Sequence, residues 1–163
     1  MTAMNRWTKA QLRDELLAVL EGQLAVAERA HQASLEGATH EEAKPENNKD
    51  TRALEQSYLA RGQAQRLMEL KAAIAAIQLI PTGAQNQGSP CALGSIVQVE
   101  DEGQTQSYWI ASTGGGTRLA QGSIQVLTPN SPLGRALVGC SLNDDCEVQV
   151  AGWTRTLTIV AIS

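Results

Sequence analysis

The chain has 163 residues, of which 42% are hydrophobic and 18% are charged, so it has the composition of a soluble globular protein and room for one domain or two small ones. Its net charge of −4 at pH 7 argues against free duplex DNA as the main ligand, because that binding depends on Lys and Arg side chains that neutralise phosphates. The N-terminus shows no basic segment followed by an apolar one, and no stretch approaches the length of a membrane span, so we expect a cytoplasmic protein.

The first predicted element is a long helix. Thr8 followed by Gln11 is typical of a capping box, in which each side chain bonds the backbone N–H of the other residue. Less polar or small residues then recur in steps of four and three, which predicts a heptad seam with one polar member. The seam consists of Leu12, Leu16, Val19, Gln23, Val26, Ala30 and Ala33.

A second helix is predicted from about residue 50 to residue 78. Its apolar face is predicted to include Leu54, Leu59, Leu67, Leu70, Ile74 and Ile77. Two matched helices, each roughly 45 Å long, favour one antiparallel coiled-coil hairpin over residues 1–80, because a lone helix with an apolar face is marginal in water. A helical bundle and a dimerisation rod remain alternatives.

The predicted hairpin tip, residues 37–51, has the sequence GATHEEAKPENNKDT. It contains four carboxylates: Glu41, Glu42, Glu46 and Asp50. One interpretation is a solvated polar turn, since charge clusters are common on exposed loops. The other is that a long rigid hairpin carries acidic oxygens to a distant place, where carboxylates suit Mg²⁺.

Residues 81–90 (PTGAQNQGSP) are predicted to be a linker, and beyond them the apolar period changes to two. Five strands are predicted around Ile96–Val99, Tyr108–Ile110, Ile124–Leu127, Val148–Val150 and Leu157–Val160. The run Gly114 to Gly116 is interpreted as a hairpin turn, because no Lys-Ser or Lys-Thr follows it as a phosphate-binding loop requires. Residues 91–163 are thus predicted to form a small, mostly antiparallel β domain.

One short helix is predicted within this β domain, in the stretch SPLGRALVG. Ser131 suits the N-cap, Pro132 the first helical position and Gly139 the left-handed stop. The three cysteines, Cys91, Cys140 and Cys146, form an odd set without a CxxC pair, which favours a reduced cytosolic setting. We interpret them as small core or surface thiols and not as zinc ligands.

The stretch SPLGRALVG, together with the preceding IQVLTP (Ile124 to Pro129) and the closing strand pair, resembles the C-terminal signature of the Gre factors. These are the GreA/GreB family of bacterial transcript-cleavage proteins. The order of hairpin, acidic tip, linker and β domain is similar to the layout of that family over essentially the whole chain. Glu46-Asn47 also resembles the Glu-Asn of the family's tip.

The resemblance implies an α+β fold in which the hairpin precedes a small FK506-binding-protein-like (FKBP-like) β domain that docks on RNA polymerase. Ser131 and Pro132 match the family's polymerase-contacting loop. Arg135 matches the basic residue beside that loop, and its alternative role is a surface salt-bridge partner. A monomer that contacts nascent RNA or DNA only inside the polymerase complex is expected.

For the hairpin, the resemblance implies entry into the secondary channel of the polymerase. Two tip carboxylates spaced three apart then help to hold a second Mg²⁺, shared with the polymerase, and the polymerase active site cuts backtracked RNA. Glu46 matches the second carboxylate, and the first falls on Ala43, so Glu42, Glu41 or Asp50 would take its place. The metal ligands implied are Glu42 and Glu46.

The expected function is therefore that of an accessory factor that stimulates RNA cleavage and is not itself an enzyme. A close alternative is a regulator that occupies the channel without stimulating cleavage. A prolyl isomerase is suggested only by the implied fold, which does not carry an activity with it. A coiled-coil adaptor that dimerises through the seam from Leu12 to Ala33 is a third alternative.

Overall fold

The computed structural model describes residues 6–42 and 49–163; the side chains of residues 38–42, 49 and 50 lie outside this description. Two compact units are present. One is Ala18–Ala75, which contains most of both long helices, and the other joins the N-terminal segment through Leu17 to Ala76–Ser163. Among the described residues, no helix combines the length and the apolar character that crossing a membrane requires.

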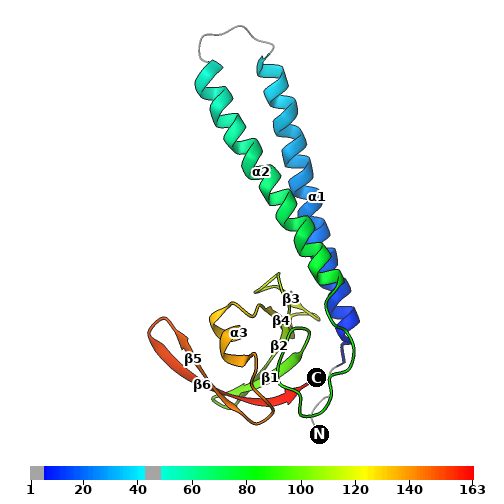
Figure 1. Ribbon diagram of the computed structural model, residues 1–163, viewed down its shortest axis with the longest axis vertical. Coiled ribbons are helices and arrows are strands. Elements are labelled where there is room, and N and C mark those ends of the chain that lie inside the picture. Colours follow the sequence, from blue (N-terminus) through cyan, green and yellow to red (C-terminus); the bar gives the residue numbers. More distant parts are fainter. Residues whose placement is uncertain (1–5, 43–48) are drawn as a thin grey trace. The chain divides into compact units, whose positions relative to one another are not determined.

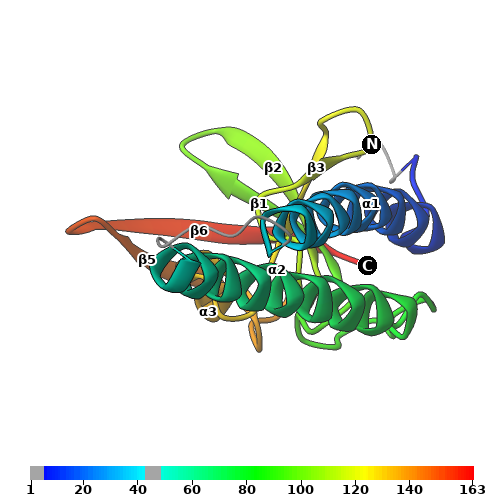
Figure 2. The same cartoon turned by 90° about the horizontal axis from the view of Figure 1, so that it is seen from above.

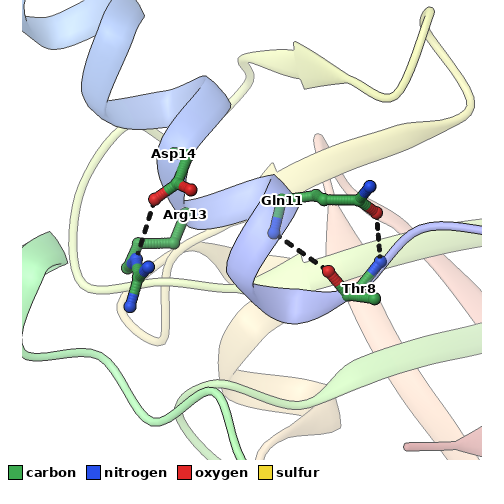
Figure 3. A network of polar contacts seen from close by, with 4 residues as sticks. All are labelled: Thr8, Gln11, Arg13 and Asp14. Carbon is green, nitrogen blue, oxygen red and sulfur yellow. Dashed lines mark hydrogen bonds and ion pairs between the residues drawn. The ribbon is translucent and has the colours of Figure 1, made fainter.

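Helix α1 (Lys9–Glu42) begins with the predicted capping box. The Gln11 backbone N–H donates to Thr8 Oγ1 at 3.1 Å, and the Thr8 backbone N–H donates to Gln11 Oε1 at 2.9 Å. Arg13 and Asp14 form an ion pair in the next positions, and Figure 3 shows both interactions. The prediction is confirmed, because two backbone donors that a helix start leaves unpaired are here satisfied by side chains.

Within the hairpin unit, α1 runs beside α2 (Lys49–Gln78), as Figures 1 and 2 both show. The predicted seam on α1 is wrong from Val19 onward. Val26, for example, is 58% exposed, whereas Leu20 is only 4% exposed. The less exposed positions of α1 in this unit include Leu20, Leu24, Ala27, His31 and Ser34. From Leu16 the packed positions continue in steps of four to Leu20 and Leu24, whereas the predicted seam continues with a step of three to Val19. The helix therefore packs its larger leucine side chains and leaves Val19 outside the contact.

The face of α2 is predicted correctly near the base and incorrectly near the tip. Leu67, Leu70 and Ile74 are buried or half-buried, but Leu54 and Leu59 are exposed. Instead, the Gln63 side-chain amide joins the helices: its Nε2 donates to Ser34 Oγ at 3.0 Å, and its Oε1 lies 3.3 Å from His31 Nδ1. The distal part of the hairpin is therefore packed with small and polar residues.

The second unit contains a six-stranded sheet in the order β3-β4-β2-β1-β6-β5. The strands are β1 (Ile96–Asp101), β2 (Gln104–Ile110), β3 (Arg118–Leu119), β4 (Ile124–Leu127), β5 (Asp145–Val150) and β6 (Trp153–Ile162). All neighbours pair antiparallel except β2 and β4, which pair in parallel. The predicted α+β class is confirmed, with one parallel pair and a sixth, two-residue strand in addition.

The glycine run does not form the predicted hairpin turn. A hairpin would require β2 to pair with β3, but β3 pairs only with β4, and β4 lies between β3 and β2. The segment after β2 therefore takes the chain from one edge of β4 to the other, and Gly114 and Gly116 in this segment have positive φ values of 83° and 88°. Glycine is suited to such backbone conformations because it has no Cβ.

Both faces of the sheet are covered. On one face, helix α3 (Pro132–Leu137) packs over the apolar side chains of the central strands, and Tyr108, Ile110 and Leu137 belong to that core. Trp109 points to the opposite face, since side chains alternate along β2. There the base of α1 is held by two contacts: the Ala120 backbone N–H donates to the Glu15 carboxylate at 3.0 and 3.2 Å, and the Leu16 side chain lies against Gly114.

Candidate functional site

The candidate site that the structure describes is helix α3 with the turn that precedes it. Ser131 is the N-cap, with an extended backbone (φ −67°, ψ 157°). Its Oγ accepts the Gly134 backbone N–H at 3.0 Å and donates to the Thr128 carbonyl oxygen at 2.8 Å. Pro132 follows in the first turn of the helix, where a missing N–H is harmless. The predicted roles of Ser131 and Pro132 in forming this helix are confirmed.

Two glycines fix how α3 sits on the domain. Gly134 is buried, and a Cβ there would lie 1.9 Å from the Thr128 carbonyl oxygen. Gly139, two residues after the end of the helix, has a φ of 91°, as predicted for a left-handed stop, and its N–H donates to the Cys91 carbonyl oxygen at 2.8 Å. The backbone of α3 is thus held closely to the turn before it and to the segment around Cys91.

The outward face of α3 is formed by Pro132, Arg135 and Val138, which are spaced by three and are all exposed. Leu133 and Leu137 turn inward, where Leu137 is fully buried. Within the described part of the chain, no hydrogen bond or ion pair engages the Arg135 guanidinium, so the alternative role as a salt-bridge partner finds no support there. We call this exposed apolar and basic surface the α3 face.

The carboxylates of the predicted hairpin tip lie outside the part of the chain that the structure describes. Glu46 lies outside the described residues, and so do the side chains of Glu41, Glu42 and Asp50. Helix α1 ends at Glu42 and α2 begins at Lys49, so the outer parts of the predicted tip, residues 37–42 and 49–51, are helical. Among the side chains that are described, no group of three or more His, Cys, Asp or Glu residues is arranged to hold a metal ion.

A shallow apolar groove runs along the hairpin unit. Its lining includes Val19, Val26 and Ala30 from α1 and Leu70 from α2, with Arg66 contributing the charge. These α1 residues belong to the heptad pattern that the sequence predicts as the hairpin seam. These residues therefore line the groove and do not form the buried contact between α1 and α2.

The three cysteines converge in the β domain, which the sequence interpretation did not anticipate. Cys91 and Cys146 are buried in the core beside α3, and Cys140 packs against that core. The only sequence signal was indirect: Cys146 and Val148 share the inward parity of β5, and Cys140 follows α3. Cys91 lies about 50 residues before the other two, so the segment around Cys91 must pack against the end of α3 before the three cysteines share one core.

Comparison with known proteins places the chain in a family. A family profile described as "Transcription elongation factor, GreA/GreB, C-term" matches residues 90–163. Transcription elongation factor GreA of Methylococcus capsulatus is 31% identical over 136 residues, which cover 82% of this chain and 81% of that protein. The chain belongs to the GreA/GreB family.

The chain is also similar, to different extents, to other proteins. Transcription elongation factor GreA of Verminephrobacter eiseniae is 34% identical over 100 residues, and the chain covers 61% of its length. The structure of GreA factor homolog 1 (Gfh1) of Thermus thermophilus has a TM-score of 0.39 at 20% identity, covering 90% of this chain and 94% of that one. A GreA/GreB factor from Nitrosomonas europaea has a TM-score of 0.36 at 16% identity, covering 71% and 95%.

Proposed function

We propose that this protein binds RNA polymerase and regulates transcription elongation from the secondary channel. The proposal is carried by membership of the GreA/GreB family, whose relatives are named transcription elongation factors. The segment that matches the family profile, residues 90–163, contains the α3 face. We assign docking on the polymerase to this face through Pro132 and Arg135, with Ser131 positioning both.

The physical argument for the α3 face is its combination of rigidity and exposure. Ser131 and Gly134 fix the helix backbone, so that Pro132 and Arg135 project from a preorganised surface. Arg is well suited to such an interface because its guanidinium pairs with carboxylates in fixed geometry. The polymerase surface that receives it is accordingly expected to present a carboxylate beside an apolar patch.

The second part of the proposal concerns the hairpin tip. Glu46, with Glu42, Glu41 or Asp50, would supply carboxylate oxygens to a Mg²⁺ shared with the polymerase; as a donor set these residues fit Mg²⁺, which prefers hard oxygen ligands. A second Mg²⁺ would stabilise charge on the attacking and leaving oxygens of the phosphodiester. On this proposal the polymerase active site cuts the RNA and the protein acts as an accessory factor in the cytoplasm.

A second candidate function is occupation of the channel without stimulation of cleavage. The observation that favours it is Ala43, which stands where the resemblance implies the first of two tip carboxylates. An alanine methyl cannot coordinate a metal, so cleavage requires that Glu42, Glu41 or Asp50 compensate. The two candidates share polymerase binding and differ only in what the tip does.

A stalled, backtracked RNA polymerase complex incubated with Mg²⁺ and this protein separates the candidates. Release of short 3′ RNA fragments supports cleavage stimulation, and binding without fragments supports the channel-occupying regulator. Glu46→Ala should abolish the fragments while leaving binding intact. Glu28→Ala, which removes an exposed carboxylate from the middle of α1, is the matched control and should change neither.

The coiled-coil adaptor is tested separately by the oligomeric state. Such an adaptor would associate through the seam from Leu12 to Ala33, in which Val26 is exposed. We expect a monomer by light scattering across the micromolar range. A stable dimer that Val26→Glu disrupts would support the adaptor and contradict the proposed monomeric factor.

A further inference from the structure

The hairpin of β5 and β6 extends beyond the ladder between β6 and β1. Strand β6 pairs with β1 from Thr158 to Ile162, whereas its ladder with β5 continues to the pair Val150–Trp153. Residues 153–157 therefore lie in a two-stranded ribbon, which Figure 1 shows projecting from the sheet. The ribbon closes through Ala151-Gly152, whose φ values of 50° and 82° suit the tight two-residue turn of twisted strands.

The two faces of this ribbon carry different chemistry. Side chains alternate along a strand, so Val150 lies on the same face as Val148, which belongs to the core that α3 covers. Trp153 stands opposite Val150 and shares its face. The acidic side chains of β5, Asp145 and Glu147, have the other parity and are exposed. The α3 side of the ribbon is therefore apolar, and the carboxylates of β5 lie on the side that faces away from α3.

The apolar face of the ribbon continues past the core into solvent. Along it the exposed fraction rises from 3% at Val148 to 48% at Val150 and 77% at Trp153. A covered aromatic side chain buries roughly 150–250 Å², and Trp is enriched among the residues that dominate binding energy at protein interfaces. Trp153 therefore has the chemistry of an anchor for a partner protein.

The base of the ribbon is held from both faces. On the α3 side, the Arg155 guanidinium pairs with the carboxylate of Asp101, the last residue of β1. On the other side, the Thr158 hydroxyl donates to Asp145 Oδ1 at 2.7 Å. Trp153 is thus presented on a preorganised support, which lowers the entropic cost of binding.

The ribbon and the α3 face lie on the same side of the sheet. Helix α3 contacts β5, and Leu137 of α3 and Val148 of β5 belong to one core cluster. Both surfaces combine exposed apolar side chains with an arginine: Arg135 on the α3 face and Arg155 beside Trp153. Their chemistry therefore suits one continuous partner surface that is apolar and acidic.

We propose that the docking surface for RNA polymerase extends from the α3 face along β5 to the tip of the ribbon, where Trp153 inserts its indole into an apolar pocket of the polymerase. This inference rests on the proposed function, which names the polymerase as the partner of the α3 face. The polymerase is the one occupant of both surfaces because they are continuous across β5 and share the same charge and polarity. Val150 forms the rim of the contact on the β5 side.

Binding of the full-length protein to core RNA polymerase tests the inference. Trp153→Ala should weaken the affinity by at least about tenfold, and Trp153→Phe should recover most of the loss. Gln149→Ala is the matched control, because Gln149 is exposed on the opposite face of the same ribbon and should not touch the polymerase. The urea midpoint of each variant should stay close to that of the native chain, since both side chains are exposed.

Arg135→Ala separates the failure of this inference from the failure of the proposed function. If Arg135→Ala weakens binding and Trp153→Ala does not, docking through the α3 face stands and its extension to the ribbon is overturned. If the native chain does not bind the polymerase, the proposed function and this inference are both wrong. If Trp153→Ala weakens binding and Arg135→Ala does not, the shared docking surface is overturned.

Photocrosslinking locates the partner surface. The photoreactive amino acid p-benzoylphenylalanine is placed at position 153 on the ribbon, at position 138 on the α3 face, and at position 149 as the control. We expect positions 153 and 138 to crosslink to one region of the polymerase and position 149 to give no crosslink. Crosslinks from 153 and 138 to remote regions, or from 153 to a second copy of this chain, would overturn the inference.

Discussion

Leu16 of α1 lies so close to Gly114 that a Cβ added to the glycine would be 2.9 Å from Leu16 Cδ1. The same short part of α1 carries Glu15, whose carboxylate accepts the Ala120 N–H. Ala120 has a positive φ of 54°, so this bond satisfies a backbone donor in a strained conformation. The base of α1 is therefore an integral part of the β-domain unit.

Gly114→Ala should destabilise this unit for two reasons: the positive φ, worth about 1–2 kcal/mol, and the contact with Leu16, worth about 1–3 kcal/mol. Gly116→Ala is the matched control, because Gly116 has a similar φ of 88° but no atom within 4 Å of an added Cβ. Urea unfolding should show a larger loss for Gly114→Ala. Equal losses would mean that the contact with Leu16 does not constrain the domain.

Gly134→Ala should displace α3 from its packed position against the turn at Thr128. The added methyl would overlap the Thr128 carbonyl oxygen at 1.9 Å, and backbone cannot yield as a flexible side chain can. We expect a loss of about 3 kcal/mol or more in the free energy of unfolding. Gly139→Ala supplies the comparison, since its φ of 91° is strained for alanine but nothing lies within 4 Å. A Gly134→Ala variant as stable as Gly139→Ala would contradict the close seating of the helix.

Local signals in the sequence predict the ends of elements well. The capping box at Thr8 and the N-cap at Ser131 depend on side chains within three residues of the backbone groups they bond, so spacing alone identifies them. The parallel pairing of β2 with β4 could not be predicted in this way. It depends on how the segment after Ile110 takes the chain from one edge of β4 to the other, and β3 is too short to show a period.

The remaining differences between prediction and structure depend on contacts between residues that are distant along the chain. Two apolar patterns coexist on α1, one through Val19 and Val26 and one through Leu20 and Leu24. Which pattern is buried depends on the partner helix, and leucine gains more from burial than valine. Similarly, Cys140 and Cys146 are unremarkable in sequence and join the same core only when α3 packs beside β5. The tip carboxylates remain a prediction that the described residues do not test.

The stability of the β domain should fall at alkaline pH because of its buried thiols. Burial is the main reason that the pKa of Cys146 rises to about 12 and that of Cys91 to about 11. In the unfolded chain thiols titrate near pH 8.5. The contribution of each thiol is thus fully present below about pH 8.5 and is lost as the pH rises toward the folded pKa.

Urea unfolding between pH 8 and pH 10.5, in the presence of a reductant, measures this loss. Each buried thiol should contribute a slope of up to about 1.4 kcal/mol per pH unit. Cys146→Ala should show a shallower slope than the native chain, although it is less stable at neutral pH. Burial also raises the pKa of Tyr108, so only the difference between the native chain and the variant isolates the thiol. If the free energy of unfolding falls with pH equally steeply in the native chain and in Cys146→Ala, the pKa of Cys146 does not differ between the folded and unfolded states, and the prediction is contradicted.

The packed face of the hairpin can be tested with a pair of truncations on α1. Leu20→Ala should lower the free energy of unfolding of the hairpin by about 2–5 kcal/mol, because it removes a side chain that is only 4% exposed. Val26→Ala should change it by less than about 0.5 kcal/mol, since surface substitutions have small effects and alanine favours helix. The melting of helical circular dichroism reports both. A larger loss for Val26→Ala than for Leu20→Ala would support the heptad seam through Val26. It would mean that α1 is rotated about its axis relative to the packing described above.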